Sequence, residues 1–167
     1  MGLLSYRGIA LAAMLSVAPT WSSLAAEPVV VAASGAAVTL GAQALAELSP
    51  HHLDLSFLAA QGMRQASFDG PLLWDVLRQA GAIDPAQHQD QVSQAIVITG
   101  RDGYRAVLAL GEIAPEFEGK SVLLARQMDG KALDAEHLRI VLPGDKRGGR
   151  SVREVARIEV VAVPKKE

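Results

Sequence analysis

The chain has 167 residues, of which 50% are hydrophobic and 20% are charged. This length fits one domain of ordinary size, and the composition is that of a chain that folds around a core. The absence of cysteine excludes thiolate catalysis, zinc–thiolate sites, iron–sulfur clusters and disulfides. Residues 27–137 hold 7 Lys/Arg and 14 Asp/Glu, whereas residues 138–167 hold 8 and 4. The basic final segment predicts an anion-facing surface or a charge-steered partner contact, or alternatively an evenly solvated rim.

Residues 1–26 have the pattern of a secretory signal peptide. Arg7 is the only charged residue among them, residues 8–18 form a short, mainly apolar run, and small residues lead up to Ala26. A basic start, a short apolar middle and a small-residue exit predict export with cleavage near Ala26. The apolar run is too short to span a bilayer. We therefore expect residues 27–167 to form a single domain in the bacterial periplasm, with no membrane span.

The first half of the mature chain predicts several short strands and one clear helix. Polar and apolar residues alternate from His52 to Leu58, which is typical of a half-buried strand. Pro71 and Gly81 suit the two ends of a helix with a Leu-rich apolar stripe, and Trp74 lies off that stripe. The other predicted elements are a strand at 29–33, a second element of unassigned type that begins at 38–40, a short helix at 45–48 that Pro50 stops, and a loop at 82–91.

The second half predicts a series of strands joined by tight turns. Asp102-Gly103 between two β-type runs, 95–98 and 104–108, is a strong hairpin signal. Ser151, with Glu154 three residues later, predicts a capped single helical turn. The remaining expectations are strands at 121–127, 138–142 and 157–163, a loop or short helix at 111–118, and an exposed basic loop at 143–149. Strands outnumber helices, and tight turns rather than helical crossovers join several of them. We therefore expect the α+β fold class, as a single domain with a mixed, largely antiparallel sheet.

Familiar catalytic motifs are missing from the sequence. It contains no P-loop, dinucleotide fingerprint, nucleophile elbow or HExxH helix. His51 and His52 are adjacent, so a strand would point them in opposite directions, and we expect no histidine metal site. The carboxylates that could be paired are Asp102 with Glu112 and Glu116 with Glu118, and all four are expected on the solvated surface.

Five basic residues carry the strongest functional signal. They are Arg139, Lys146, Arg147, Arg150 and Arg153, gathered around a glycine-rich loop. Guanidinium groups bind phosphate or carboxylate in a bidentate manner, and glycine lets an anion approach the backbone amides. A helical turn would place Arg150 and Arg153 on one side. The candidate ligand-binding residues are Arg139, Arg147, Arg150, Arg153 and Tyr104. The alternatives are a basic loop without a ligand and a Tyr104 that is a half-buried strand residue.

Through five segments in the same order, the chain resembles the molybdopterin-binding domain of the sulfite oxidase family. In chain order they are the aromatic–Gly entry and Leu-rich helix at 68–82, the Asp-Gly-Tyr hairpin at 102–110, the Leu-Leu-Ala strand and Asp-Gly turn at 123–133, the strand ending in Pro at 139–143, and the basic-Ser-Val-basic segment with the last strand at 150–160. The resemblance implies that family's fold and a molybdopterin ligand.

The resemblance also implies a metal ligand that this chain lacks. In the family a cysteine thiolate ligates molybdenum, and the corresponding region at about 55–62 holds Ser56 but no cysteine. The resemblance implies that Arg150 and Arg153 correspond to the basic segment that contacts the pterin phosphate in the family. We therefore expect a module that binds a pterin, another phosphorylated ligand or a periplasmic protein, and no nucleic acid. An active molybdenum oxidoreductase with non-cysteine ligation is the alternative, so catalysis is left open.

Overall fold

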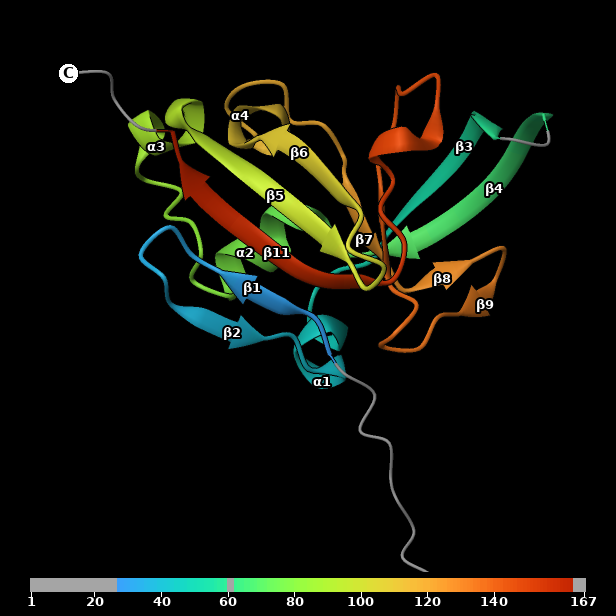
Figure 1. The fold of residues 1–167 in the computed structure, drawn as a ribbon, viewed down its shortest axis with the longest axis horizontal. Coiled ribbons are helices and arrows are strands. Elements are labelled where there is room, and N and C mark those ends of the chain that lie inside the picture. The colour runs from blue at the N-terminus through green and yellow to red at the C-terminus, as the bar shows by residue number, and fades with distance from the viewer. Residues whose placement is uncertain (1–26, 60–61, 164–167) are drawn as a thin grey trace, which may run out of the picture.

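The structure is a computed structural model that describes residues 27–59 and 62–163 (Figure 1). The predicted signal peptide lies outside these residues. Within them the chain forms three β-sheets, four short α-helices and one 3-10 helix. The prediction of an α+β domain with a mixed, largely antiparallel sheet is confirmed, because one strand pair is parallel and the other seven pairs are antiparallel.

The largest sheet has five strands. In spatial order they are β2 (Ala37–Thr39), β1 (Val29–Val31), β11 (Val155–Ala162), β5 (Gln94–Gly100) and β6 (Arg105–Ala109). β5 and β6 pair antiparallel around the Asp102-Gly103 turn, which confirms the predicted hairpin. Helix α2 (Leu73–Gln79) lies behind this sheet in Figure 1 and covers its inner face.

The main core lies between α2 and the five-stranded sheet. Ile96 and Ile98 of β5, Ile158 of β11 and Leu77 of α2 are all fully buried. Burying each of these side chains contributes about 1.5–3 kcal/mol before the cost of ordering the chain. Trp74 lies off the predicted stripe, yet it is only 9% exposed and belongs to the same core.

The other two sheets extend to one side of the large one. Their strands are β3 (His51–Ala59), β4 (Gly62–Gly70), β8 (Gln127–Met128) and β9 (Lys131–Ala132) in one sheet, and β7 (Leu123–Ala125) with β10 (Arg139–Val141) in the other. The predicted strand at β3 is confirmed. β4 was missed because residues 62–70 contain no β-branched side chain. Its nine cross-strand pairs with β3 form the ribbon instead.

Gly70 joins the two small sheets. A Cβ at this position would overlap the carbonyl oxygen of Leu124 in β7, so only glycine permits the close approach. The backbone N–H of Leu124 donates to the oxygen of Pro71 at 3.0 Å, and that of Arg126 donates to Asp69 at 2.8 Å. A second cluster of buried apolar residues, which includes Phe68 of β4, packs at this junction.

The remaining helices are short. They are α1 (Ala42–Ala46), α3 (His88–Ser93), α4 (Leu110–Ile113) and the 3-10 helix η1 (Gly148–Arg150). The predicted loop at 82–91 is wrong at its end, because α3 begins at His88. This helix buries Gln91, and the side-chain amide of Gln91 donates a hydrogen bond to the Pro85 oxygen at 2.9 Å. Among the described residues, no helix is long and apolar enough to cross a membrane.

Candidate functional site

The basic loop between β10 and β11 stands between two parts of the fold. Its residues, drawn in orange-red, rise between β6 and β3 in Figure 1. The backbone N–H of Leu58 in β3 donates to the Lys146 oxygen at 3.4 Å, and Leu58 forms an isolated bridge with Arg147. On the other side, the Tyr104 hydroxyl donates to the Gly149 oxygen at 2.5 Å. The predicted basic loop is therefore held in place from both sides.

The predicted helical turn at Ser151 is wrong. The single turn that forms is η1, which precedes Ser151, and Ser151 is its extended C-terminal cap. Glu154 adopts a left-handed backbone with φ of 50° rather than capping a helix. Arg150 and Arg153 consequently do not share one side of a turn, and their side chains have different surroundings.

Arg150 is held by two carboxylates. Its guanidinium binds Asp145 in a bidentate manner, with Nη2–Oδ1 at 2.6 Å and Nε–Oδ2 at 3.0 Å, and its Nη1 lies 3.1 Å from Glu112 Oε2. Glu112 also accepts hydrogen bonds from the backbone N–H of Ala109 at 3.1 Å and from Lys120 Nζ at 3.2 Å. This carboxylate network fastens the basic loop to α4, and the geometry makes Arg150 a loop anchor.

The network shifts the ionisation of its members. The hydrogen bond from Arg150 lowers the pKa of Asp145, and the bonds with Asp145 and then Glu112 raise the pKa of Arg150. Partial burial acts to raise the pKa of Glu112. The hydrogen bonds from Ala109, Lys120 and Arg150 outweigh that effect, so the pKa of Glu112 is lowered. All the charged forms are thus favoured by folding.

We expect these shifts to make the domain sensitive to acid. Because folding lowers the pKa of Glu112 and Asp145, their contribution to stability is present above the ordinary carboxyl values and is lost as the pH falls through the lowered ones. Thermal unfolding from about pH 6 to about pH 3 should show a steeper loss for the wild type than for Arg150→Gln. Arg78→Gln, which removes an exposed pair with Asp75, is the control. Equal slopes for the wild type and Arg150→Gln would contradict the assignment.

Arg139 has the opposite environment to Arg150. No carboxylate of the described chain lies within ion-pair distance of it, and its Nε is buried without a hydrogen-bond partner there. Its Nη1 lies 3.3 Å from the Met128 sulfur, and its guanidinium carbon lies 5.3 Å from the centre of the Phe68 ring. Burial, and then the charge of Arg153, lower the pKa of Arg139. A partly buried cation that lacks an anionic partner is costly to maintain.

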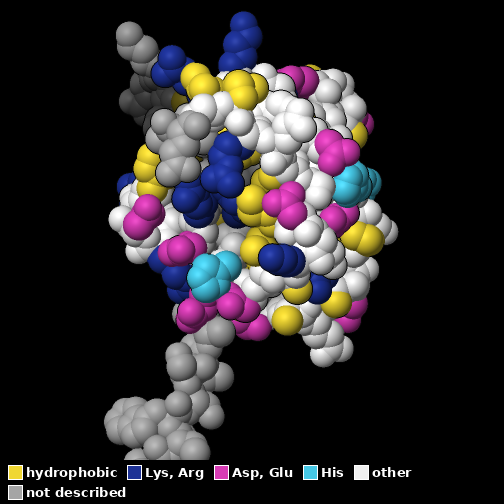
Figure 2. Space-filling view, turned by 90° about the vertical axis from the view of Figure 1, so that its right-hand side faces the viewer, with side chains coloured by type: hydrophobic (Ala, Val, Ile, Leu, Met, Phe, Trp, Pro, Cys, Tyr) yellow, Lys and Arg dark blue, Asp and Glu magenta, His cyan; other side chains and the backbone are white. Residues whose placement is uncertain are grey.

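Arg139 lines a hollow whose wall also contains two other arginine side chains. This basic hollow, of about 220 Å³, is lined by Arg139, Arg147 and Arg153 together with Phe57, Leu58, Gly148, Gly149 and Ser151, so its lining includes no carboxylate. Lys and Arg side chains gather around a recess on this side of the molecule (Figure 2). In the described structure, no carboxylate lies within salt-bridge distance of Arg147 or Arg153. The arrangement fits a small multivalent anion.

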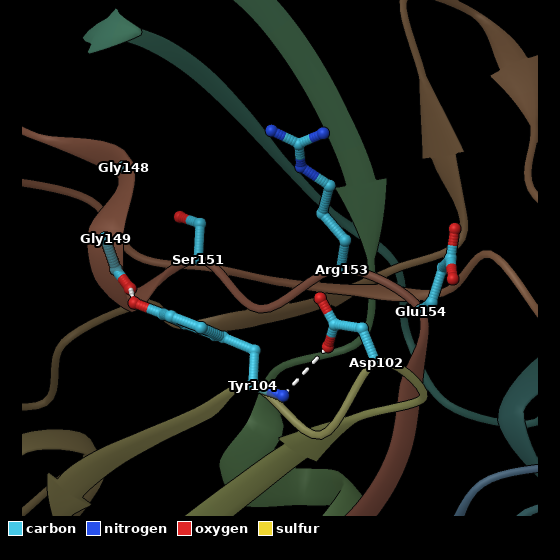
Figure 3. A pocket seen from close by; sticks show the side chains of 7 residues that line it. All are labelled: Asp102, Tyr104, Gly148, Gly149, Ser151, Arg153 and Glu154. Carbon is cyan, nitrogen blue, oxygen red and sulfur yellow. Dashed lines mark hydrogen bonds between the residues drawn. The ribbon is translucent and has the colours of Figure 1, made fainter. Parts of the chain in front are cut away.

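Tyr104 lies in an adjoining polar hollow. Its lining contains Asp102, Tyr104 and Glu154, and it shares Gly148, Gly149, Ser151 and Arg153 with the basic hollow. Figure 3 shows the Tyr104 ring reaching toward Gly149 and the Arg153 guanidinium pointing away from the carboxylates of Asp102 and Glu154. Asp102 accepts a hydrogen bond from the Tyr104 backbone N–H at 2.9 Å. Tyr104 is 49% exposed, so it is not the half-buried strand residue of the alternative prediction.

The structure thus divides the five candidate residues. Arg139, Arg147 and Arg153 line one hollow, Tyr104 lines the next, and Arg150 is held by carboxylates. Sequence reasoning missed Phe57, Asp145 and Glu112. Glu112 was expected on the solvated surface, and no local signal connects it with Arg150, which is 38 positions later. The glycine-rich loop was recognisable in the sequence, but only the fold shows that Gly148 of this loop lies against the Phe57 ring.

Comparison with known proteins assigns the chain to a family. The model of the oxidoreductase molybdopterin binding domain family matches residues 47–167. The chain belongs to this family. The resemblance noted from the sequence is therefore confirmed. No curated protein matches the chain by sequence.

A solved structure supports the fold of this family member. The chain is similar to the sulfane dehydrogenase SoxCD from Paracoccus pantotrophus, with a TM-score of 0.63 at 16% sequence identity. The match covers 81% of this chain and 38% of that chain, so this chain spans well under half of that protein's length. At this level of identity the likeness establishes the fold alone.

The residues of this oxidoreductase molybdopterin-binding-domain protein fit the two parts of a molybdenum–pterin cofactor unequally. Arg139, which has no carboxylate partner in the described structure, and the cations beside it fit a phosphate-bearing part. The metal part has no thiolate, because the chain has no cysteine. In the described part of the chain, no three His, Asp or Glu side chains gather in a way that could hold a metal ion. Ser56 lines a third, more apolar hollow beside the basic one.

Proposed function

We propose that this protein is an exported module that binds a phosphate-bearing ligand of the pterin class in the basic hollow, without thiolate ligation of a metal. The observation that carries the proposal is Arg139, a partly buried guanidinium with no carboxylate partner in the described structure, facing the same hollow as Arg147 and Arg153. A bound phosphate would supply the negative charge that these three cations lack.

The ligand class rests on family membership and on the hollow together. A molybdopterin-binding family supplies the expectation of a pterin, and the cationic lining supplies the attraction for its phosphate. The proposal of export rests on the sequence pattern of residues 1–26. A partner protein that meets the same basic surface is the second possibility, and it is raised by the charge distribution of the sequence.

Calorimetric titration of the protein purified from its exported form tests this proposal. We expect neopterin monophosphate to bind and unphosphorylated neopterin to bind at least ten-fold more weakly, because charge-assisted bonds contribute about 1.5–3 kcal/mol. Affinity should also fall with added salt. N-terminal sequencing of the same sample should give a start near residue 27. If both compounds bind equally, or neither binds, the proposal fails. Stoichiometric molybdenum in that sample would instead support the alternative, an oxidoreductase with non-cysteine ligation.

A further inference from the structure

The basic hollow has an aromatic wall that the anion alone does not require. Phe57 of β3 lines the basic hollow, and it also lines the neighbouring hollow of about 310 Å³ that contains Leu55 and Leu142. The Phe57 side chain is half-buried, with part of it packed against the Phe68 cluster. One aromatic ring therefore borders two adjacent hollows, the second of which is lined by charged and polar side chains as well as by apolar ones.

The glycine loop is shaped around this ring. A Cβ added to Gly148 would lie 3.3 Å from Phe57 Cδ2, which is tighter than most Cβ contacts, so the ring or the loop would have to shift by a few tenths of an ångström. Gly148 has no need of a left-handed backbone, since it is absent from the residues with positive φ. Its lack of a side chain thus serves the close approach of the loop to the ring. Gly148, Ser151 and Arg147 also line both hollows, so the two spaces are adjacent.

We propose that Phe57 is a specificity-determining residue, against which the planar ring system of the ligand lies while the phosphate binds Arg139, Arg147 and Arg153. This inference rests on the proposed function. It adds the residue that recognises the ring system of the ligand, because the three cations recognise only its phosphate. Aromatic side chains bind flat heterocycles by stacking and by burying apolar area, and cations do not replace that contribution. The preferred ligand is accordingly an aromatic heterocycle with a phosphate ester, and neither free phosphate nor an aliphatic phosphate should bind as well.

The test compares two phosphate esters on the whole protein. Neopterin monophosphate carries a ring and glycerol phosphate does not, while the charge is the same. In the wild type the ring-bearing ester should bind about ten-fold more tightly, a factor typical of one stacked ring. Phe57→Leu retains an apolar side chain in the core and should abolish this preference, while the affinity for glycerol phosphate changes by no more than about two-fold. Gly148→Ala should act in the same direction by displacing the ring.

Each outcome is informative. If Phe57→Leu weakens both esters equally, or weakens neither, Phe57 is a packing residue and the inference is wrong. If the double variant Asp102→Asn, Glu154→Gln removes the preference while Phe57→Leu keeps it, the ring lies in the polar hollow instead and the inference is also overturned. If the wild type binds both esters with equal affinity, the proposed phosphate site stands and only this inference fails. If the wild type binds neither ester, the proposed function itself fails. Thermal unfolding of every variant verifies that it is folded.

Discussion

Replacing Arg139 with methionine is expected to weaken the binding of neopterin monophosphate by about ten- to a hundred-fold. In the ligand-free protein the same change should leave the free energy of unfolding unchanged or raise it by about 1 kcal/mol. The two effects have one cause. Arg139 is partly buried and has no carboxylate partner in the described structure, so its charge is costly until an anion arrives. Methionine retains a long apolar stem that can pack on Phe68 and Met128.

Two further variants separate charge from geometry at this position. Arg139→Lys keeps the charge but loses the planar fork, so it should recover only part of the affinity. Arg105→Met makes the same chemical change on the exposed surface of β6, outside the lining of the basic hollow, and should leave binding unchanged. The contact with the Phe68 ring offsets part of the desolvation cost. If Arg139→Met loses more than about 1 kcal/mol of stability while binding is retained, Arg139 is a structural residue.

The second large effect is expected in the network that anchors the loop. Glu112→Gln should lower the free energy of unfolding by about 2 kcal/mol, because the carboxylate accepts hydrogen bonds from Arg150, Lys120 and the Ala109 N–H. For a domain of this size, the midpoint of thermal unfolding should fall by about 6 °C. Glu112 is suited to this test because its side chain is only 23% exposed, so solvent screens its interactions less than those of surface pairs.

Glu116→Gln is the matched control for this variant. It makes the same chemical change in a carboxylate that is 59% exposed and pairs with His88 at the surface, so its effect should stay below about 0.5 kcal/mol. Glu112→Gln should also weaken neopterin monophosphate binding by a few-fold, since Gly148 and Arg147 belong to the loop that Arg150 anchors. Equal stability losses for the two variants would show that the network does not stabilise the fold.

Local sequence patterns determined the elements whose stabilising contacts lie nearby in the chain. The β5–β6 hairpin follows from Asp102-Gly103 between two β-type runs, because the turn fixes the pairing. β3 follows from its alternation, and α2 from an apolar stripe between Pro71 and Gly81. The family was also recognisable, since five weak segments in a fixed order are more specific than any one of them.

Only the tertiary structure decided which of the basic residues are available to a ligand. Arg150 and Arg153 are equivalent in a local pattern, but Arg150 meets Asp145 and Glu112, whereas Arg153 faces the basic hollow. Tertiary contacts also decided two other features. β4 is a strand because β3 lies beside it, and Phe57 meets Gly148 only in the folded chain. The sequence alone determined that cations gather in the last segment and that no thiolate is present. Which cations lack a carboxylate depends on contacts between residues far apart in the chain, and local periodicity does not encode such contacts.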